Sequence, residues 1–154
     1  MKIETNKMKF IIKILLLSSL LLSASCASGL NNNQKRKLIA VKNEFPELYE
    51  EEKDPVLAVA LGLLPGGGSF YTRSYGTGAV SLLLWPLSVL WDPINGLNAS
   101  QEINYYATTR SLKRAKKKEL KKIKSEYSEK KISEQQFNIQ KMDIDEKYDL
   151  DNLL

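Results

Sequence analysis

The sequence contains no histidine and only one cysteine, Cys26, among its 154 residues. One cysteine cannot form a disulfide within the chain, so no internal cross-link can stabilise the fold. With no histidine and no second cysteine, the usual ligand sets for zinc, haem and iron–sulfur clusters are also missing. We therefore expect no metal and no cofactor. We also expect no enzyme, because the sequence holds neither a nucleophile–base set nor paired carboxylates in an apolar setting.

The sequence also shows no convincing strand pattern and no internal repeat. The fold class is therefore predicted from the helical spacing of its apolar residues. We expect an all-α protein with a signal peptide, an apolar helical hairpin with a Gly-rich hinge, a long basic amphipathic helix and a short C-terminal helix. The expected segments are the signal peptide (1–25), a tether with a short amphipathic helix (26–54), the apolar membrane hairpin (55–93), the basic helix (98–131) and the C-terminal helix (133–149).

The first 25 residues have the order of an export signal. Four lysines precede an apolar run over 14–22, and small residues occupy positions 23–25. That order is typical of a secretory signal peptide. The apolar run is shorter than the roughly 17–25 residues that a bilayer-spanning helix needs.

Cys26 directly follows these small residues, and Ser23-Ala24-Ser25-Cys26 resembles the lipobox of bacterial lipoproteins. The resemblance implies cleavage before Cys26 and lipidation of its thiol, which would leave the protein exported and anchored in the cell envelope. The box is a relaxed one, because Ser23 stands where an aliphatic residue is usual. Two alternatives remain open: an ordinary signal peptide cut after Ala27, and an uncleaved anchor helix.

The asparagines at 31–33 suit a polar tether. Apolar residues with helical spacing follow them. Leu38, Val41 and Phe45 recur at intervals of three and four, so an amphipathic helix is predicted over 34–44. Pro46 should interrupt this helix, because its ring removes a backbone donor.

Two stretches without any charged side chain dominate the middle of the chain, at 55–71 and 74–91, and Arg73 lies between them. Each is rich in Leu, Val and Ala and lies at the lower edge of transmembrane length. Two apolar helices joined by a short connection would form an antiparallel hairpin. We therefore predict that this segment enters a membrane, either as a full span or lying shallow.

The connection reads LLPGGGSFYTRSYGTG, residues 63–78. It lacks the lysine and the preceding strand of a phosphate-binding loop. A hinge at the membrane surface uses its features better, because proline stops a helix, glycines turn the chain, and aromatics and arginine suit the interface. The predicted membrane-hinge residues are Pro65, Gly66, Gly67, Gly68, Phe70, Tyr71, Arg73, Gly76 and Gly78.

This block resembles a widespread two-transmembrane-helix domain family built round a Gly-rich turn, a Phe-Tyr pair and a downstream basic residue. The resemblance covers about residues 55–92 and implies a membrane hairpin, with no particular activity. Ser69 and Thr72 stand where that family often has His or Arg and Gly. No ligand role is therefore carried over.

The tail carries a second resemblance, over about residues 120–145, to the short C-terminal helical module called SHOCT. Ser133 and Gln136 form a capping box at the start of its last helix. The resemblance implies oligomerisation or attachment, and the alternative is a solvated helical hairpin. The matching residues are Leu120, Ile123, Ile132, Ser133, Glu134, Phe137 and Lys141. The predicted partner or oligomer face is Leu120, Ile123, Tyr127, Phe137 and Ile144.

The run from Arg110 to Lys124 holds nine basic side chains and one acid. Anionic lipid headgroups are the expected partner, and the alternative is a solvated helix face. Nucleic acid is not expected, because an export signal precedes the run and no stacking aromatics interrupt it. The run conflicts with a simple exported hairpin, since lysine-rich segments prefer the cytoplasmic side.

These signals together predict an exported, membrane-anchored lipoprotein of the bacterial cell envelope, without separating inner from outer membrane. We expect a structural or scaffolding role, with self-association or binding of an envelope protein through the C-terminal helices. The alternative is a small oligomeric transport or pore component built from the apolar hairpin. The lack of charge within either apolar run speaks against that alternative.

Overall fold

The computed structural model describes residues 29–152, and this range contains helices and no strands, which confirms the all-α prediction. The signal peptide and Cys26 lie outside the described residues. The helices are α2 (Asn32–Glu44), η1 (Pro46–Leu48), α3 (Pro55–Leu61), α4 (Gly67–Tyr71), α5 (Tyr75–Leu83), η2 (Leu87–Leu90), α6 (Asp92–Ser128) and α7 (Glu134–Lys147).

The described chain divides into two compact units. Residues 55–99 hold α3, α4, α5, η2 and the first turns of α6. We call them the inner-polar unit, because their buried side chains are mostly polar. Residues 30–54 and 100–152 form the second unit, with α2, η1, α7 and the rest of α6.

The prediction of two long apolar helices is wrong. The segment 55–91 instead folds into three short α-helices and the 3-10 helix η2, and α4 packs against both α3 and α5. Residues 29–152 contain no helix with the length and apolar character required to cross a membrane. The physical reason is that α3 ends in tight turns at Gly62–Leu64, and Pro86 lies between α5 and η2.

The long basic helix begins earlier than the sequence indicates. The basic helix predicted over 98–131 is α6, which starts six residues earlier at Asp92 and runs without a break to Ser128. Proline is tolerated in the first turn of a helix, where its missing N–H would be unpaired anyway. Gly96 lies within α6 and packs closely against the backbone of Ala58 in α3.

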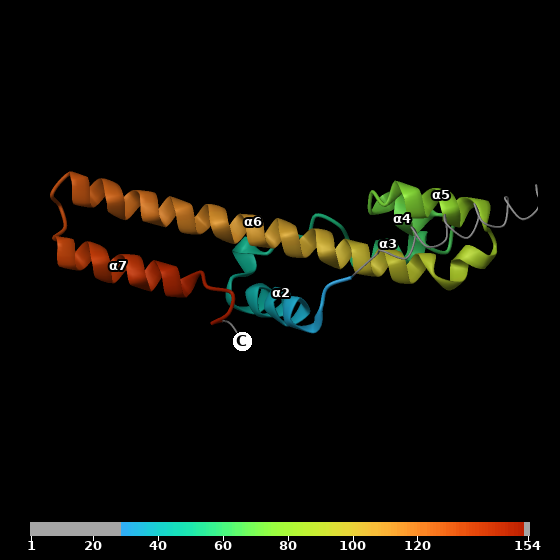
Figure 1. The fold of residues 1–154 in the computed structure, drawn as a ribbon, viewed down its shortest axis with the longest axis horizontal. Helices are drawn as coiled ribbons and strands as arrows, with labels where there is room; N and C mark the ends of the chain where they lie inside the picture. The colour runs from blue at the N-terminus through green and yellow to red at the C-terminus, as the bar shows by residue number, and fades with distance from the viewer. Residues whose placement is uncertain (1–28, 153–154) are drawn as a thin grey trace, which may run out of the picture. The chain divides into compact units, whose positions relative to one another are not determined.

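The helix boundaries in the second unit agree with the sequence more closely. The helix expected over 34–44 is α2, and Asn31, assigned to the tether, in fact caps it together with Gln34. The capping box of Ser133 and Gln136 is confirmed at the start of α7. Lys130 has a positive φ of 57° in the turn before it, and α6 and α7 then run side by side in opposite directions (Figure 1).

Candidate functional site

Asp92, the first residue of α6, is fully buried at the centre of the inner-polar unit. Its carboxylate accepts hydrogen bonds from the Ser69 hydroxyl at 2.5 Å, the Ser81 hydroxyl at 3.1 Å and the Gly68 amide at 3.0 Å. These donors belong to α4 and α5, so one side chain joins three helices. A buried carboxylate is costly unless hydrogen bonds replace its water, and here both of its oxygens are engaged.

Further polar groups surround this carboxylate. The indole N–H of Trp91 donates to the Ser81 hydroxyl at 3.1 Å, so Ser81 links the ring to Asp92. The Thr72 hydroxyl donates back to the Gly68 carbonyl at 3.0 Å within α4. Ser88 is also buried. The centre of this unit is therefore polar, and most of its polar groups bond one another.

Two glycines allow the backbones of this unit to approach closely. A Cβ on Gly68 or on Gly96 would lie 2.8 Å from the Ala58 carbonyl oxygen of α3. Such a contact is too short for any real side chain, so both positions require glycine. Small residues at helix contacts permit this backbone approach, which is common where helices pack in lipid.

The outer surface of the same unit is apolar. Thirteen large hydrophobic side chains are exposed, from 36% for Val89 to 78% for Leu83. They come from every helix of the unit and from the α3–α4 link. They are Val56, Leu57, Leu63, Leu64, Phe70, Tyr75, Leu82, Leu83, Trp85, Leu87, Val89, Leu90 and Ile94. The unit therefore inverts the usual distribution, with polar groups inside and apolar groups outside.

The predicted hinge residues have separate roles in this arrangement. Gly66 has a φ of 72°, and a Cβ there would lie 2.4 Å from the Gly78 carbonyl oxygen, so it is a true turn glycine. Gly67 and Gly68 are helical within α4. Phe70 packs against Gly78, while Gly76 has open space around it. Pro65 and Tyr71 are half-buried, and Arg73 is exposed with a φ of 64°.

The predicted partner face is brought together in the second unit, but within one chain. Ile123 of α6 and Ile144 of α7 are buried, and the rings of Tyr127 and Phe137 stack with centroids 5.0 Å apart. Leu120 is half-buried on α6. Four of these residues are buried or half-buried within this chain, while Tyr127 is still 41% exposed.

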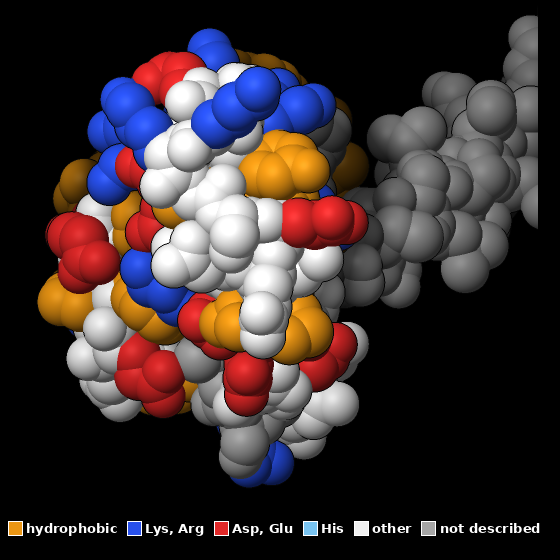
Figure 2. All heavy atoms as spheres, turned by 90° about the vertical axis from the view of Figure 1, so that its left-hand side faces the viewer, with side chains coloured by type: hydrophobic (Ala, Val, Ile, Leu, Met, Phe, Trp, Pro, Cys, Tyr) orange, Lys and Arg blue, Asp and Glu red, His pale blue; other side chains and the backbone are white. Residues whose placement is uncertain are grey.

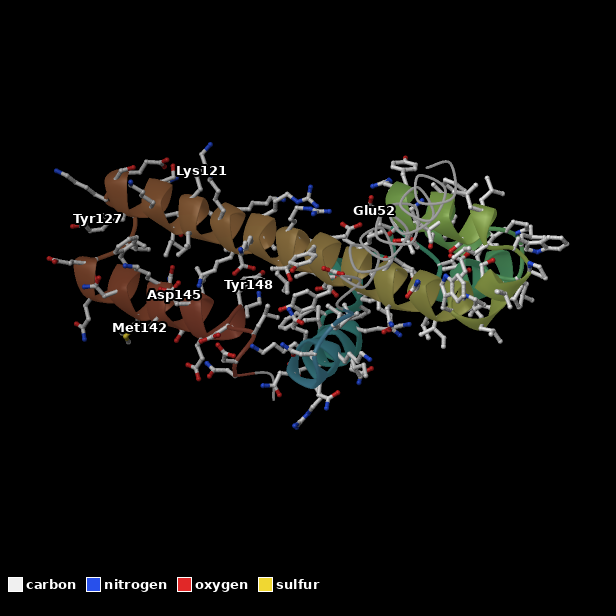
Figure 3. The ribbon with its side chains drawn as sticks, turned by 45° about the vertical axis from the view of Figure 1, so that its right-hand side comes forward. Glu52, Lys121, Tyr127, Met142, Asp145 and Tyr148 are labelled. Carbon is white, nitrogen blue, oxygen red and sulfur yellow. The ribbon has the colours of Figure 1, made fainter. Side chains whose placement is uncertain are left out.

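Ion pairs reinforce the contact between α6 and α7. Lys116 lies 2.8 Å from Asp145, and Lys147 donates to Glu119 at 2.8 Å. Tyr148 donates to the same Glu119 oxygen at 2.8 Å, and Figure 3 shows Asp145 and Tyr148 directed toward α6. The hydrogen bond from Lys147 lowers the pKa of Glu119, and that from Lys116 lowers the pKa of Asp145.

The acidic segment that follows η1 also binds α6. The side-chain amide of Asn104 donates to the Lys53 carbonyl at 2.7 Å and accepts from the Lys53 amide at 2.9 Å. The Glu50 amide donates to the Thr108 hydroxyl at 3.0 Å. Arg110 pairs with Glu52 at 3.3 Å. This anchor was not predicted; the one local signal is that the polar residues Asn104 and Thr108 are four apart and so share a helix face, and their burial appears only in the folded chain.

A small cavity of about 200 Å³ lies between α6 and the end of the chain. Its lining residues are Thr109, Leu112, Lys113, Lys116, Tyr148, Asp149 and Leu150. Among residues 29–152, no cluster of acidic or cysteine side chains is arranged to hold a metal ion. The inverted surface of residues 55–99 is therefore the most distinctive candidate site.

In comparisons with known proteins, no protein-family model, curated protein or solved structure matches this chain.

Proposed function

We propose that this protein is a membrane-bound scaffold of the bacterial cell envelope. In this proposal the inner-polar unit inserts into the hydrocarbon of one leaflet, and lipidated Cys26 adds a second anchor. The second unit remains in the aqueous phase, where it binds a second copy or an envelope protein. The observation that supports the proposal is the set of thirteen exposed apolar side chains around a hydrogen-bonded polar centre.

The energetic argument favours lipid over water for this surface. Burying one large aliphatic or aromatic side chain is worth about 1.5–3 kcal/mol. Because these side chains are about half exposed, five of them entering hydrocarbon would gain roughly 4–8 kcal/mol before entropy costs. The nine residues of α5 rise about 14 Å, roughly half of a hydrocarbon core, so insertion into one leaflet suits its length.

The polar centre suits the same environment. Hydrocarbon offers no water to unpaired donors, so a lipid-immersed fold must satisfy its polar groups internally. The Asp92 cluster does this, with Ser69, Ser81 and the Gly68 amide all directed at one carboxylate. A transport or pore role is less well supported, because these groups bond each other and do not line an open path.

The scaffolding role calls for an exposed contact surface on the second unit. Since the predicted face closes α6 onto α7, the remaining apolar side chains of α7 are Ile139, 46% exposed, and Met142, 64% exposed. Figure 3 shows Met142 directed away from α6. We propose these two residues as the partner contact. Cross-linking of Ile139→Asp/Met142→Asp protein should lose the wild-type oligomers; unchanged oligomers would remove this part of the proposal.

Flotation with phosphatidylcholine vesicles tests the membrane role. The full chain should float with the vesicles, and Leu83→Ser/Leu87→Ser/Leu90→Ser should shift it toward the soluble fraction. The matched control is Ile139→Ser/Met142→Ser, which changes exposed apolar residues of the second unit and should float normally. Cys26→Ser, with fatty-acid labelling, separates the lipid anchor. A full chain that stays soluble beside these vesicles would overturn the proposal.

A further inference from the structure

The basic run of α6 is divided by the fold into two sets of side chains. One set is paired with acids: Arg110 with Glu52, Arg114 with Glu50, Lys116 with Asp145 and Lys122 with Glu126. Within residues 29–152, no ion pair or hydrogen bond joins the other set to an acid. That set includes Lys113, Lys117, Lys121 and Lys124, all of them exposed.

These four lysines share one face of α6. At about 100° per residue they fall within an arc of about 80°, and they extend over about 16 Å of helix axis. Leu112 and Ile123, which are buried, lie on a different side of the helix. Figure 3 shows Lys121 directed away from α7, and Figure 2 shows Lys and Arg side chains gathered near the top of that view, with acidic side chains beside them. We call this row the lysine stripe.

We propose that the lysine stripe binds the anionic headgroups of a phospholipid surface, while the paired basic residues of the same run serve the fold. The inference rests on the proposed membrane function, because anchoring the chain in a membrane raises the local concentration of headgroups around it. Lysine ammonium groups near an anionic surface attract it without a shaped pocket. A row of flexible ammonium groups with no aromatic side chain over 110–124 suits a phosphate-bearing surface better than stacked bases.

No acid within residues 29–152 pairs with the stripe, although Lys113 borders the cavity that Asp149 also lines. Asp145 and Glu119 are engaged on the α7 side of α6, and Glu50 and Glu52 pair with the two arginines. The acidic tail, which the sequence places next to the basic run, therefore neutralises part of it and leaves four charges in one row. Substituting the four stripe lysines should therefore weaken headgroup binding without breaking any of the ion pairs within residues 29–152.

The test measures partition of the full chain into phosphatidylcholine vesicles with and without phosphatidylglycerol. The readout is the ratio of the two partition coefficients, so insertion into neutral lipid cancels. Each lysine near an anionic surface is worth about fivefold in affinity, so Lys113→Gln/Lys117→Gln/Lys121→Gln/Lys124→Gln should lower the ratio by up to about six hundredfold. At about 1 M salt the wild-type ratio should collapse as well.

A matched control removes the same charge from other parts of the second unit: Lys35→Gln/Arg36→Gln/Lys130→Gln/Lys141→Gln. We expect its ratio to stay within a few fold of wild type. Glutamine keeps the helix propensity of lysine, and circular dichroism checks that α6 is retained. An equal loss in the control, an unchanged ratio in the stripe variant, or tight binding of single-stranded RNA without any lipid preference would each overturn the inference. Failure to enter neutral vesicles would instead count against the membrane proposal.

Discussion

The carboxylate of Asp92 and the hydroxyl of Ser69 are hydrogen-bonded at 2.5 Å, although 23 residues separate them in the chain. Through this contact the first residue of α6 holds α4, and through Ser81 it also holds α5. Apolar side chains point outward in this unit, so hydrogen bonds and close backbone contacts replace an ordinary hydrophobic core.

Replacing Asp92 should unfold the inner-polar unit selectively. In Asp92→Ala, two buried hydroxyls and one amide lose their acceptor, which we expect to cost about 2–4 kcal/mol. Both tryptophans of the chain, Trp85 and Trp91, lie in this unit, so tryptophan fluorescence in detergent micelles reports its unfolding. The exposed Asp143→Ala of α7 is the control, and equal stability of the two variants would contradict the role of Asp92.

The glycines of this unit should differ sharply in their tolerance of alanine. Gly68→Ala and Gly96→Ala should each destabilise the unit by about 1–3 kcal/mol, because the new methyl group meets the Ala58 carbonyl. Gly76→Ala has free space in α5 and should stabilise it by about 0.5–1 kcal/mol. Thermal unfolding in micelles measures all three. A purely flexible hinge would instead tolerate the three substitutions alike.

Docking of α7 should depend on its buried positions and not on its exposed ones. Ile144→Ala should cost about 2 kcal/mol or more, because Ile144 is buried against α6. Ile139→Ala, on the same helix but 46% exposed, should change stability little. Protease cleavage in the turn 129–132 measures undocking. Similar cleavage rates for the two variants would show that α7 is not held by this contact.

Acid should loosen α7, because the lowered pKa values of Glu119 and Asp145 mark stabilisation of their charged forms. This stabilisation is present above their ordinary pKa values of 4.5 and 3.8 and is lost as the pH falls through the lower folded values. We expect little change between pH 7 and 5 and increasing turn cleavage below, measured with an acid-active protease. Glu119→Gln should flatten this profile and Glu146→Gln should not; identical profiles would exclude the ion pairs as the cause.

At alkaline pH the docking of α7 should depend on Lys147. Its hydrogen bond to Glu119 raises the pKa of Lys147 above 10.5, so this contribution is complete at lower pH and is lost only as the pH rises past that value. Docking measured by circular dichroism should therefore stay level from pH 7 to about pH 10. A marked loss near neutral pH would point to another titrating group.

Local patterns were sufficient to predict much of the second unit. Ser133 with Gln136 predicted the start of α7, and the spacing of Leu38 and Val41 predicted α2, because caps and helical periodicity depend on residues three or four apart. Local patterns did not predict the start of α6, because Asp92-Pro93 can either end one helix or begin the next. Both interpretations are locally allowed, and contacts of Asp92 with Ser69 and Ser81 select the second.

The amino-acid sequence alone thus determined the all-helical class, the helix caps of the second unit and the concentration of uncharged residues between 55 and 91, since these follow from composition and short-range periodicity. The tertiary structure decided which groups face inward. Long-range hydrogen bonds to Asp92 and backbone contacts at Gly68 and Gly96 join residues up to 38 positions apart, from Ala58 to Gly96, and no local pattern contains them. The same holds for the lysine stripe, because acids elsewhere in the chain pair with its neighbours and leave it exposed.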